Sequence, residues 1–214
     1  MLPDPASQQG ERIAGLWHGF VWVALAVGVL VWGLVAYALI RFRRRDDRIP
    51  SQKPYNVPFE IAYTAIPVLI VGALFAFSVS AQTDVDRLSA NPDVRVTVEG
   101  FQWQWRFTYP EDGIVLTGSP ESGPPELVVP VGETVRFDLV SDDVNHSFWV
   151  PDFLEKRDLI PGVHNEIDIT PTRVGTFVGR CAEFCGLDHW RMSFSVRVVP
   201  ADEFDDWVAE QAHA

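Results

Sequence analysis

The sequence has 214 residues, of which 47% are hydrophobic and 21% are charged, and its formal net charge is −12. A chain of this length holds one or two domains. The excess of acidic over basic residues, 29 against 17, argues against nucleic acid as a partner, because phosphate binding needs clustered Lys and Arg. A basic protein partner is compatible with this charge.

Two long apolar stretches occupy the first part of the chain. Residues 16–40 and residues 61–81 contain no Asp, Glu, Lys or Arg. As a helix, the first stretch would be about 38 Å long, and the hydrocarbon core of a bilayer is about 30 Å thick. The alternative is a buried core helix, but such helices are rarely apolar on every side at this length. Pro67 lies in the second stretch, where membrane helices tolerate a proline. We therefore predict a transmembrane helix over each stretch.

The segments around these spans indicate their orientation. Residues 1–15 are polar and lack the basic region of a signal peptide. Residues 41–60, between the spans, begin with the run Arg41-Phe-Arg-Arg-Arg45. The positive-inside rule places such a loop in the cytoplasm. We therefore expect residues 1–15 and everything after residue 81 to lie outside the cytoplasm.

Short segments with period-two alternation fill the second part of the chain. A polar linker is expected over 82–92, and strands separated by Pro, Gly and Asp are expected over 93–200. Aromatic residues occupy every second position of one segment: Phe101, Trp103, Trp105, Phe107 and Tyr109. About seven short strands of this kind predict a β-sandwich or barrel of about 100 residues. Residues 201–214 are expected to form a tail or a short helix.

A cluster of soft side chains lies in residues 181–192, which contain both cysteines and the only methionine besides Met1. Its members are Cys181, Cys185, His189 and Met192. Alternating segments flank the cluster, so it is expected on a loop between two strands. Thiolate and thioether select Cu(I), and imidazole also suits copper. His146, which follows another predicted strand, is the candidate for a fifth ligand.

Four interpretations of the cysteine pair compete. A disulfide needs Cα atoms within about 7 Å, which the i, i+4 spacing allows, but it leaves the other three side chains unexplained. Zinc has no use for a thioether, and a blue-copper site takes a single Cys. A binuclear copper site uses all five side chains. Two copper ions that share two sulfurs spread one electron over both ions, and zinc has no redox chemistry, so this interpretation predicts electron transfer.

Together these features resemble subunit II of the haem-copper cytochrome c oxidases. The resemblance covers residues 12–200 and is strongest for actinobacterial members. It is carried by the two spans, Gln102-Trp103-Gln104-Trp105, His146-Ser147 and Cys181-x3-Cys185-x3-His189-x2-Met192. It implies a helical hairpin followed by an all-β, Greek-key cupredoxin domain with a CuA centre of two copper ions. The implied bridging ligands are Cys181 and Cys185, the capping ligands are His146 and His189, and the weak ligands are Met192 and the carbonyl of Glu183.

The resemblance also implies roles outside the copper centre. The Glu183 side chain would bind a magnesium ion shared with subunit I, and Trp103 would receive electrons from cytochrome c. Glu60, in Glu60-Ile-Ala-Tyr63-Thr64, would mark the mouth of a proton channel in the neighbouring subunit. Two departures from the family pattern concern the path of electrons into the centre. Gln104 replaces an aromatic residue, and Trp149 lies one place later than the usual tryptophan.

The implied function is that of a copper electron-transfer subunit of a terminal oxidase in the bacterial plasma membrane. It would accept electrons from cytochrome c or from a c-type haem domain, including a domain that belongs to a bc1–oxidase supercomplex. It would pass them to haem in subunit I, where oxygen is reduced to water and protons are pumped. Subunits I and III are the implied partners, and the chain alone would catalyse nothing. The rival hypotheses are a copper-free subunit II of a quinol oxidase and a membrane-tethered zinc or disulfide module that binds a partner.

Overall fold

The structure, a computed structural model, describes residues 2–45, 47, 49, 51–118 and 123–212. The chain divides into two compact units, Gly15–Gln82 on the one hand and Met1–Ala14 with Thr83–Ala214 on the other. The predicted loop 41–60 and the predicted tail 201–214 each include residues outside the described part.

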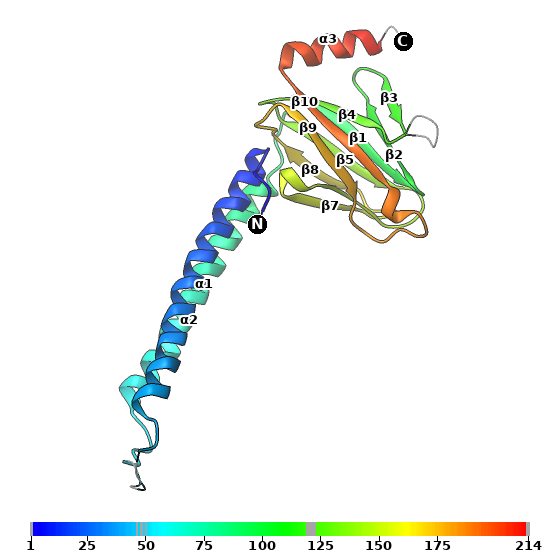
Figure 1. The fold of residues 1–214 in the computed structure, drawn as a ribbon. Helices are drawn as coiled ribbons and strands as arrows, with labels where there is room; N and C mark the ends of the chain where they lie inside the picture. The colour runs from blue at the N-terminus through cyan, green and yellow to red at the C-terminus, as the bar shows by residue number, and fades with distance from the viewer. Residues whose placement is uncertain (1, 46, 48, 50, 119–122, 213–214) are drawn as a thin grey trace. The chain divides into compact units, whose positions relative to one another are not determined.

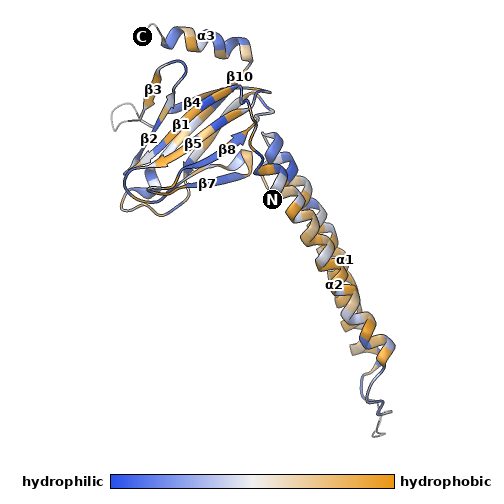
Figure 2. Cartoon of the chain, turned by 180° about the vertical axis from the view of Figure 1, so that it is seen from behind, coloured by the Kyte–Doolittle hydropathy of each residue, from blue (hydrophilic) through white to orange (hydrophobic). Residues whose placement is uncertain are grey.

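Two long helices contain the apolar stretches: α1 spans Gln8–Arg41 and α2 spans Val57–Val85 (Figure 1). Both are long and apolar enough to cross a membrane. Their large apolar side chains are exposed, for example Trp22 at 72% and Leu69 at 72%, and apolar residues follow both helices along their length (Figure 2). A helix that is apolar on every side and not covered by protein is suited to lipid.

Side-chain caps explain why both helices begin before the predicted spans. The Ser7 hydroxyl accepts a hydrogen bond from the Gly10 N–H at 3.0 Å, so α1 begins inside the predicted segment 1–15. At α2, the Glu60 carboxylate accepts the Asn56 N–H at 2.9 Å, and the Asn56 side chain accepts the N–H of Phe59 at 3.4 Å. This reciprocal arrangement is a capping box, which satisfies N–H groups that have no partner within the helix.

The second unit contains a β-sandwich of two five-stranded sheets, with strand orders β3-β2-β1-β5-β8 and β4-β10-β9-β6-β7. The first sheet consists of β1 (Val94–Phe101), β2 (Gln104–Tyr109), β3 (Ile114–Thr117), β5 (Val135–Ser141) and β8 (Asn165–Ile169). The second consists of β4 (Glu126–Pro130), β6 (His146–Val150), β7 (Glu155–Leu159), β9 (Gly175–Cys181) and β10 (Ser193–Val199). Short 3-10 helices η1 (Pro151–Phe153) and η2 (His189–Arg191) interrupt the loops, and helix α3 (Ala201–Gln211) ends the described chain.

An aromatic cluster fills the sandwich at the end that carries the cysteines. Phe148 and Phe194 stack with ring centroids 4.9 Å apart, and the fully buried Trp105 packs edge-on against Phe194 at 5.1 Å. Trp105 also contacts the ring of His146, with centroids 6.4 Å apart. The hydrophobic core therefore extends directly to the candidate metal ligand on β6.

The aromatic alternation predicted from Phe101 to Tyr109 is not one strand. β1 ends at Phe101 and β2 begins at Gln104, and these two residues pair across an antiparallel hairpin. A connection of two residues, Gln102 and Trp103, preserves the period-two count, so alternation alone could not reveal the turn. Trp105 is consequently a core residue, whereas Trp103 lies in the turn and is half-buried.

Residues ahead of α1 belong to the sandwich unit. The Ala6 N–H donates to the carbonyl of Asp152 at 2.8 Å, and the Ala6 carbonyl accepts the N–H of Thr172 at 2.9 Å. Ala6 and Ser7 are fully buried. The polar composition of residues 1–15 gave no sign of this contact, because two buried residues form no periodic pattern.

The chain that leaves α2 is also fixed to the sandwich. Arg136 and Asp168 form a buried ion pair between β5 and β8. Ser89 joins this pair, since its N–H donates to the Asp168 carboxylate at 2.6 Å and its carbonyl accepts the Arg136 guanidinium at 2.7 Å. Every charged group of the buried pair thus has a hydrogen-bond partner, as burial of charge requires.

Candidate metal centre

The loop that contains the cysteines is attached to the sandwich at both ends. β9 ends at Cys181, whose N–H donates to the carbonyl of Met192 at 2.9 Å, immediately before β10. The Ala182 N–H donates to the carbonyl of Ser147 on β6 at 3.1 Å. These backbone bonds place the first thiol and the thioether opposite each other on neighbouring strands, as expected for a loop between two strands.

His146 reaches the same place from the first position of β6. Its side chain is completely buried. A Cβ at Gly100, on the neighbouring sheet, would lie 3.1 Å from the His146 Cβ, so a larger residue at that position would displace the imidazole. The lack of a side chain at Gly100 allows the two sheets to approach around the ring.

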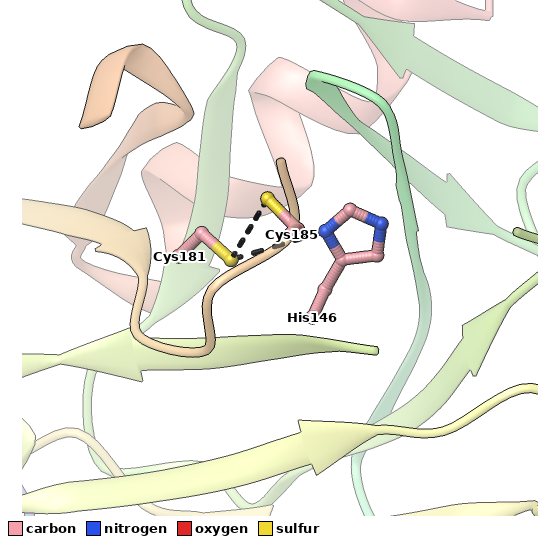
Figure 3. Close-up of side chains that lie close together, drawn as sticks. All are labelled: His146, Cys181 and Cys185. Atoms are coloured by element: carbon pink, nitrogen blue, oxygen red, sulfur yellow. Dashed lines mark hydrogen bonds between the residues drawn. The ribbon is translucent and has the colours of Figure 1, made fainter. Parts of the chain in front are cut away.

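The five predicted ligand side chains converge. The Sγ atoms of Cys181 and Cys185 are 3.9 Å apart, and each faces one imidazole. His146 Nδ1 lies 3.8 Å from Cys181 Sγ, and His189 Nδ1 lies 3.6 Å from Cys185 Sγ. Met192 Sδ is 3.8 Å from Cys185 Sγ. Figure 3 shows the two sulfur atoms and the His146 ring directed toward one another.

The backbone carbonyl predicted as a weak ligand is also nearby, since the carbonyl oxygen of Glu183 lies 3.2 Å from Cys181 Sγ. The cysteines are free thiols, and the distance between their sulfur atoms far exceeds the about 2.05 Å of a disulfide. The disulfide interpretation therefore does not describe this structure.

The electrostatics of the two thiols differ. Burial raises the pKa of Cys181, but hydrogen bonds from His146 and the Glu183 region outweigh it, so that pKa is lowered. Burial raises the pKa of Cys185, and the adjacent sulfur of Cys181 raises it further. Two thiolates this close repel each other, and a bound metal cation removes that repulsion.

The donor set fits copper. Two thiolate sulfurs, a thioether and two imidazole nitrogens form a soft set of the kind that copper prefers. The three sulfur side chains are buried, with exposed fractions of 5% for Cys181, 3% for Cys185 and 2% for Met192. Zinc does not use a thioether ligand, so a zinc site would leave the buried Met192 without a role.

Trp103 contacts the cysteine loop directly. Its indole N–H donates to the carbonyl of Cys185 at 3.2 Å, and the Gln102 side-chain amide donates to the same carbonyl at 2.8 Å. Gly186 makes this possible: its φ is +122°, and a Cβ there would lie 3.1 Å from the Trp103 ring. The predicted role of Trp103 in receiving electrons stays a prediction, but its ring is hydrogen-bonded to a candidate ligand residue.

Two further predicted roles concern carboxylates that are not among the converging donor atoms. Glu60 belongs to the unit Gly15–Gln82, where its carboxylate caps α2. The Glu183 side chain is half-buried. A proton-channel role for Glu60 and a magnesium site at Glu183 therefore stay predictions.

One polar contact of the centre was missed by reasoning from the sequence. The Asp143 carboxylate lies 2.8 Å from His146 Nε2. Burial raises the pKa of Asp143, but hydrogen bonds from Val144 and His146 lower it by more, so the pKa is lowered overall. The sequence signal is an aspartate three residues before a candidate ligand, which is a spacing too common to stand out.

Comparison with known proteins bears on this site. The family model described as "Cytochrome C oxidase subunit II, transmembrane domain" matches residues 1–80. The model described as "Cytochrome C oxidase subunit II, periplasmic domain" matches residues 123–199, which include all six predicted copper-ligand positions.

Individual proteins agree with these matches. The chain is 40% identical to a probable cytochrome c oxidase subunit 2 of Streptomyces avermitilis, over 99% of this chain and 78% of the relative. It is 33% identical to cytochrome c oxidase subunit 2 of Mycobacterium tuberculosis, over 98% of this chain and 74% of the relative. Among solved structures, it is similar to the periplasmic domain of subunit II of cytochrome oxidase of Bradyrhizobium japonicum, with 34% identity and a TM-score of 0.52 over 58% of this chain and 96% of that one.

Proposed function

The chain belongs to the cytochrome c oxidase subunit II family, whose members are subunits of a haem-copper oxidase, and we propose that its buried soft side chains hold a binuclear CuA centre. The observation that carries this proposal is the convergence of two thiols, two imidazoles and a thioether in the sandwich unit. The proposed ligands are Cys181, Cys185, His146, His189, Met192 and the carbonyl oxygen of Glu183.

Bound copper would supply one-electron redox chemistry, which no protein side chain of this site supplies by itself. The chain's contribution is to hold the donor atoms still. Cys181 and Met192 are joined by a backbone hydrogen bond, and His146 starts a strand that is paired on both sides. Because these donors are fixed by neighbouring strands of one sheet, their positions would change little when an electron arrives or leaves.

We propose that electrons enter from cytochrome c or a c-type haem domain, through Trp103. The hydrogen bond from the Trp103 indole to the carbonyl of Cys185 gives a short covalent and hydrogen-bonded connection to a bridging sulfur. Three large apolar side chains of the same cysteine loop are highly exposed: Phe184 at 78%, Leu187 at 82% and Trp190 at 79%. An exposed apolar patch of this kind is typical of an interaction surface, and the net charge of −12 favours a basic donor.

We further propose that the chain is anchored in the bacterial plasma membrane beside subunits I and III. It would pass electrons to haem in subunit I, where oxygen is reduced to water and protons are pumped, and Glu183 would share a magnesium ion with that subunit. The sandwich and both chain ends would lie on the extracytoplasmic side. The hydrogen bonds between Ala6 and the sandwich support the same side for the N-terminal segment and the sandwich, and the basic loop after α1 supports the cytoplasm for the connection.

A metal count on the purified full-length chain tests the proposal. We expect two copper ions per chain and an electron paramagnetic resonance (EPR) spectrum in which one unpaired electron is shared by two copper nuclei. The variant Cys185→Ser removes one bridging sulfur and should lose the shared-electron signal. A single copper, or a colourless chain that holds zinc, would reject the binuclear centre and favour one of the rival modules.

A further inference from the structure

We propose that Asp143 is a positioning residue of this centre, which fixes the imidazole of His146 and links it to the turn that carries Trp103. The inference rests on the proposed function, because it concerns ligands of the copper centre. Its basis is the set of hydrogen bonds around one carboxylate in the loop between β5 and β6.

The first link is to the imidazole. An ionised carboxylate only accepts hydrogen bonds, so the 2.8 Å contact with Asp143 Oδ1 requires a proton on His146 Nε2. The lone pair of the neutral ring is then on Nδ1, the nitrogen that faces Cys181 Sγ at 3.8 Å. A carboxylate that accepts the second ring N–H of a ligand histidine fixes both its tautomer and its orientation.

The carboxylate is itself held in place. Its Oδ1 atom also accepts the N–H of Val144 at 2.6 Å. Ser141 Oγ lies 3.3 Å from the same oxygen and donates to the carbonyl of Val144 at 2.6 Å. These contacts come from the end of β5 and from the loop that leads into β6, so the acceptor is attached to the frame of the sandwich. A side chain fixed in this way can orient a ring, whereas a freely rotating surface carboxylate cannot.

The second link is to the Trp103 turn. Asp143 Oδ2 accepts the backbone N–H of Gln102 at 2.7 Å. The side chain of Gln102 donates in turn to the carbonyl of Cys185 at 2.8 Å, and the Trp103 indole donates to the same carbonyl. One carboxylate therefore joins the ring on β6, which faces Cys181, to the residues that donate to the carbonyl of Cys185.

A simple charge effect is the competing explanation, because the Asp143 side chain is 31% exposed and an acidic surface attracts a basic donor. The chain offers a matched control in Asp142, the exposed neighbour that carries the same charge. Asp142 makes no hydrogen bond to a candidate ligand among the described residues. Substitution at either position removes one negative charge from the same loop, but only substitution at Asp143 removes the contacts with His146 and Gln102.

The test compares full-length chains with Asp143→Ala, Asp143→Asn, Asp142→Ala and Asp142→Asn. Copper affinity is measured by competition with a chelator, and the centre is characterised by EPR and by its reduction potential. We expect Asp143→Ala to lose roughly 10–100-fold in copper affinity, the usual effect of removing such a partner, with a changed EPR spectrum and potential. Asn keeps one acceptor oxygen for the His146 N–H but turns an NH₂ group toward the Gln102 N–H, so Asp143→Asn should be intermediate.

The outcomes separate the two explanations. If all four variants keep the copper affinity, spectrum and potential of the unmodified chain and differ only in the concentration of donor they need, Asp143 acts by charge and the inference is wrong. Thermal unfolding of the copper-free chains shows whether Asp143→Ala still folds, and Asp143→Asn decides the question if it does not. If the unmodified chain itself binds no copper, the proposed function fails, which is a different result from equal behaviour of copper-loaded variants.

Discussion

The two histidines of the proposed centre lie in different surroundings. His146 is fully buried, starts a strand, packs against Trp105 and has a hydrogen-bond partner at its second nitrogen. His189 is half-exposed, lies in the one-turn helix η2 and packs against Phe184, which is itself 78% exposed. Within the described part of the chain, its second nitrogen has no hydrogen-bond partner. One side of the centre is thus positioned by the sandwich and the other by a surface loop.

Removing each imidazole in turn should expose this difference most strongly. We expect His146→Gly and His189→Gly each to lose the two-copper EPR signal, because each removes one donor. Imidazole added to the buffer should restore the signal of His189→Gly, since its site opens to solvent, and should not restore that of His146→Gly. EPR titration with imidazole measures this, and equal rescue of both variants would show that the two sides are equally accessible.

Aromatic residues on the two sides of the proposed centre should differ in their effect on stability. Phe194 is 2% exposed and stacks on Phe148 beneath Trp105, so Phe194→Ala should destabilise the sandwich by about 3–5 kcal/mol. Phe184→Ala, on the His189 side, should change stability by no more than about 0.5 kcal/mol. Thermal unfolding of the copper-free full-length chains in detergent compares them. A large loss in Phe184→Ala would mean that the loop is as well packed as the core.

The exposed side of the centre is also the side that Trp103 contacts. Trp103→Ala should slow oxidation of the electron donor by about tenfold or more, an increase of about 1.4 kcal/mol in the barrier, with copper content unchanged. Trp103→Phe keeps an aromatic ring but loses the N–H that bonds to the carbonyl of Cys185. Its rate of donor oxidation should lie between those of the unmodified chain and Trp103→Ala. Stopped-flow oxidation of reduced cytochrome c by the assembled oxidase provides the measurement. Normal rates in Trp103→Ala would place the electron path elsewhere.

Substitution of Met192 should affect the redox properties of the proposed centre more than the stability of the fold. Leu has nearly the same volume, so Met192→Leu should change stability by less than about 1.5 kcal/mol. The thioether is the weak donor beside Cys185, so its loss should shift the reduction potential and alter the spectrum. Redox titration measures the reduction potential, and thermal unfolding of the same samples measures the stability, so the two effects are observed separately. A variant with unchanged potential and spectrum would show that Met192 only fills space.

The sequence predicted the side chains that converge in the candidate centre, but little of what surrounds them. Composition reveals the apolar stretches, and spacing reveals the candidate ligands of the loop, because Cys and Met are rare enough for their clustering to carry information. Asp143 could not be predicted in the same way, since its contact with His146 depends on the backbone path between β5 and β6. The Trp103 turn was hidden because two inserted residues preserve a period of two. The short strands β3, β6 and β7 were likewise missed, having too few residues to show a pattern.

The contact of Ser7 with the sandwich has a consequence for how this protein is made. Its hydroxyl donates to the carbonyl of Phe153, 146 positions further along the chain, so the site that binds Ser7 exists only after those later residues have been synthesised. Closing so long a loop carries an entropic penalty that grows with the logarithm of its length, and pairings this distant in sequence form slowly. The residues ahead of α1, although synthesised before the sandwich, are therefore expected to reach their final position only after the sandwich has formed.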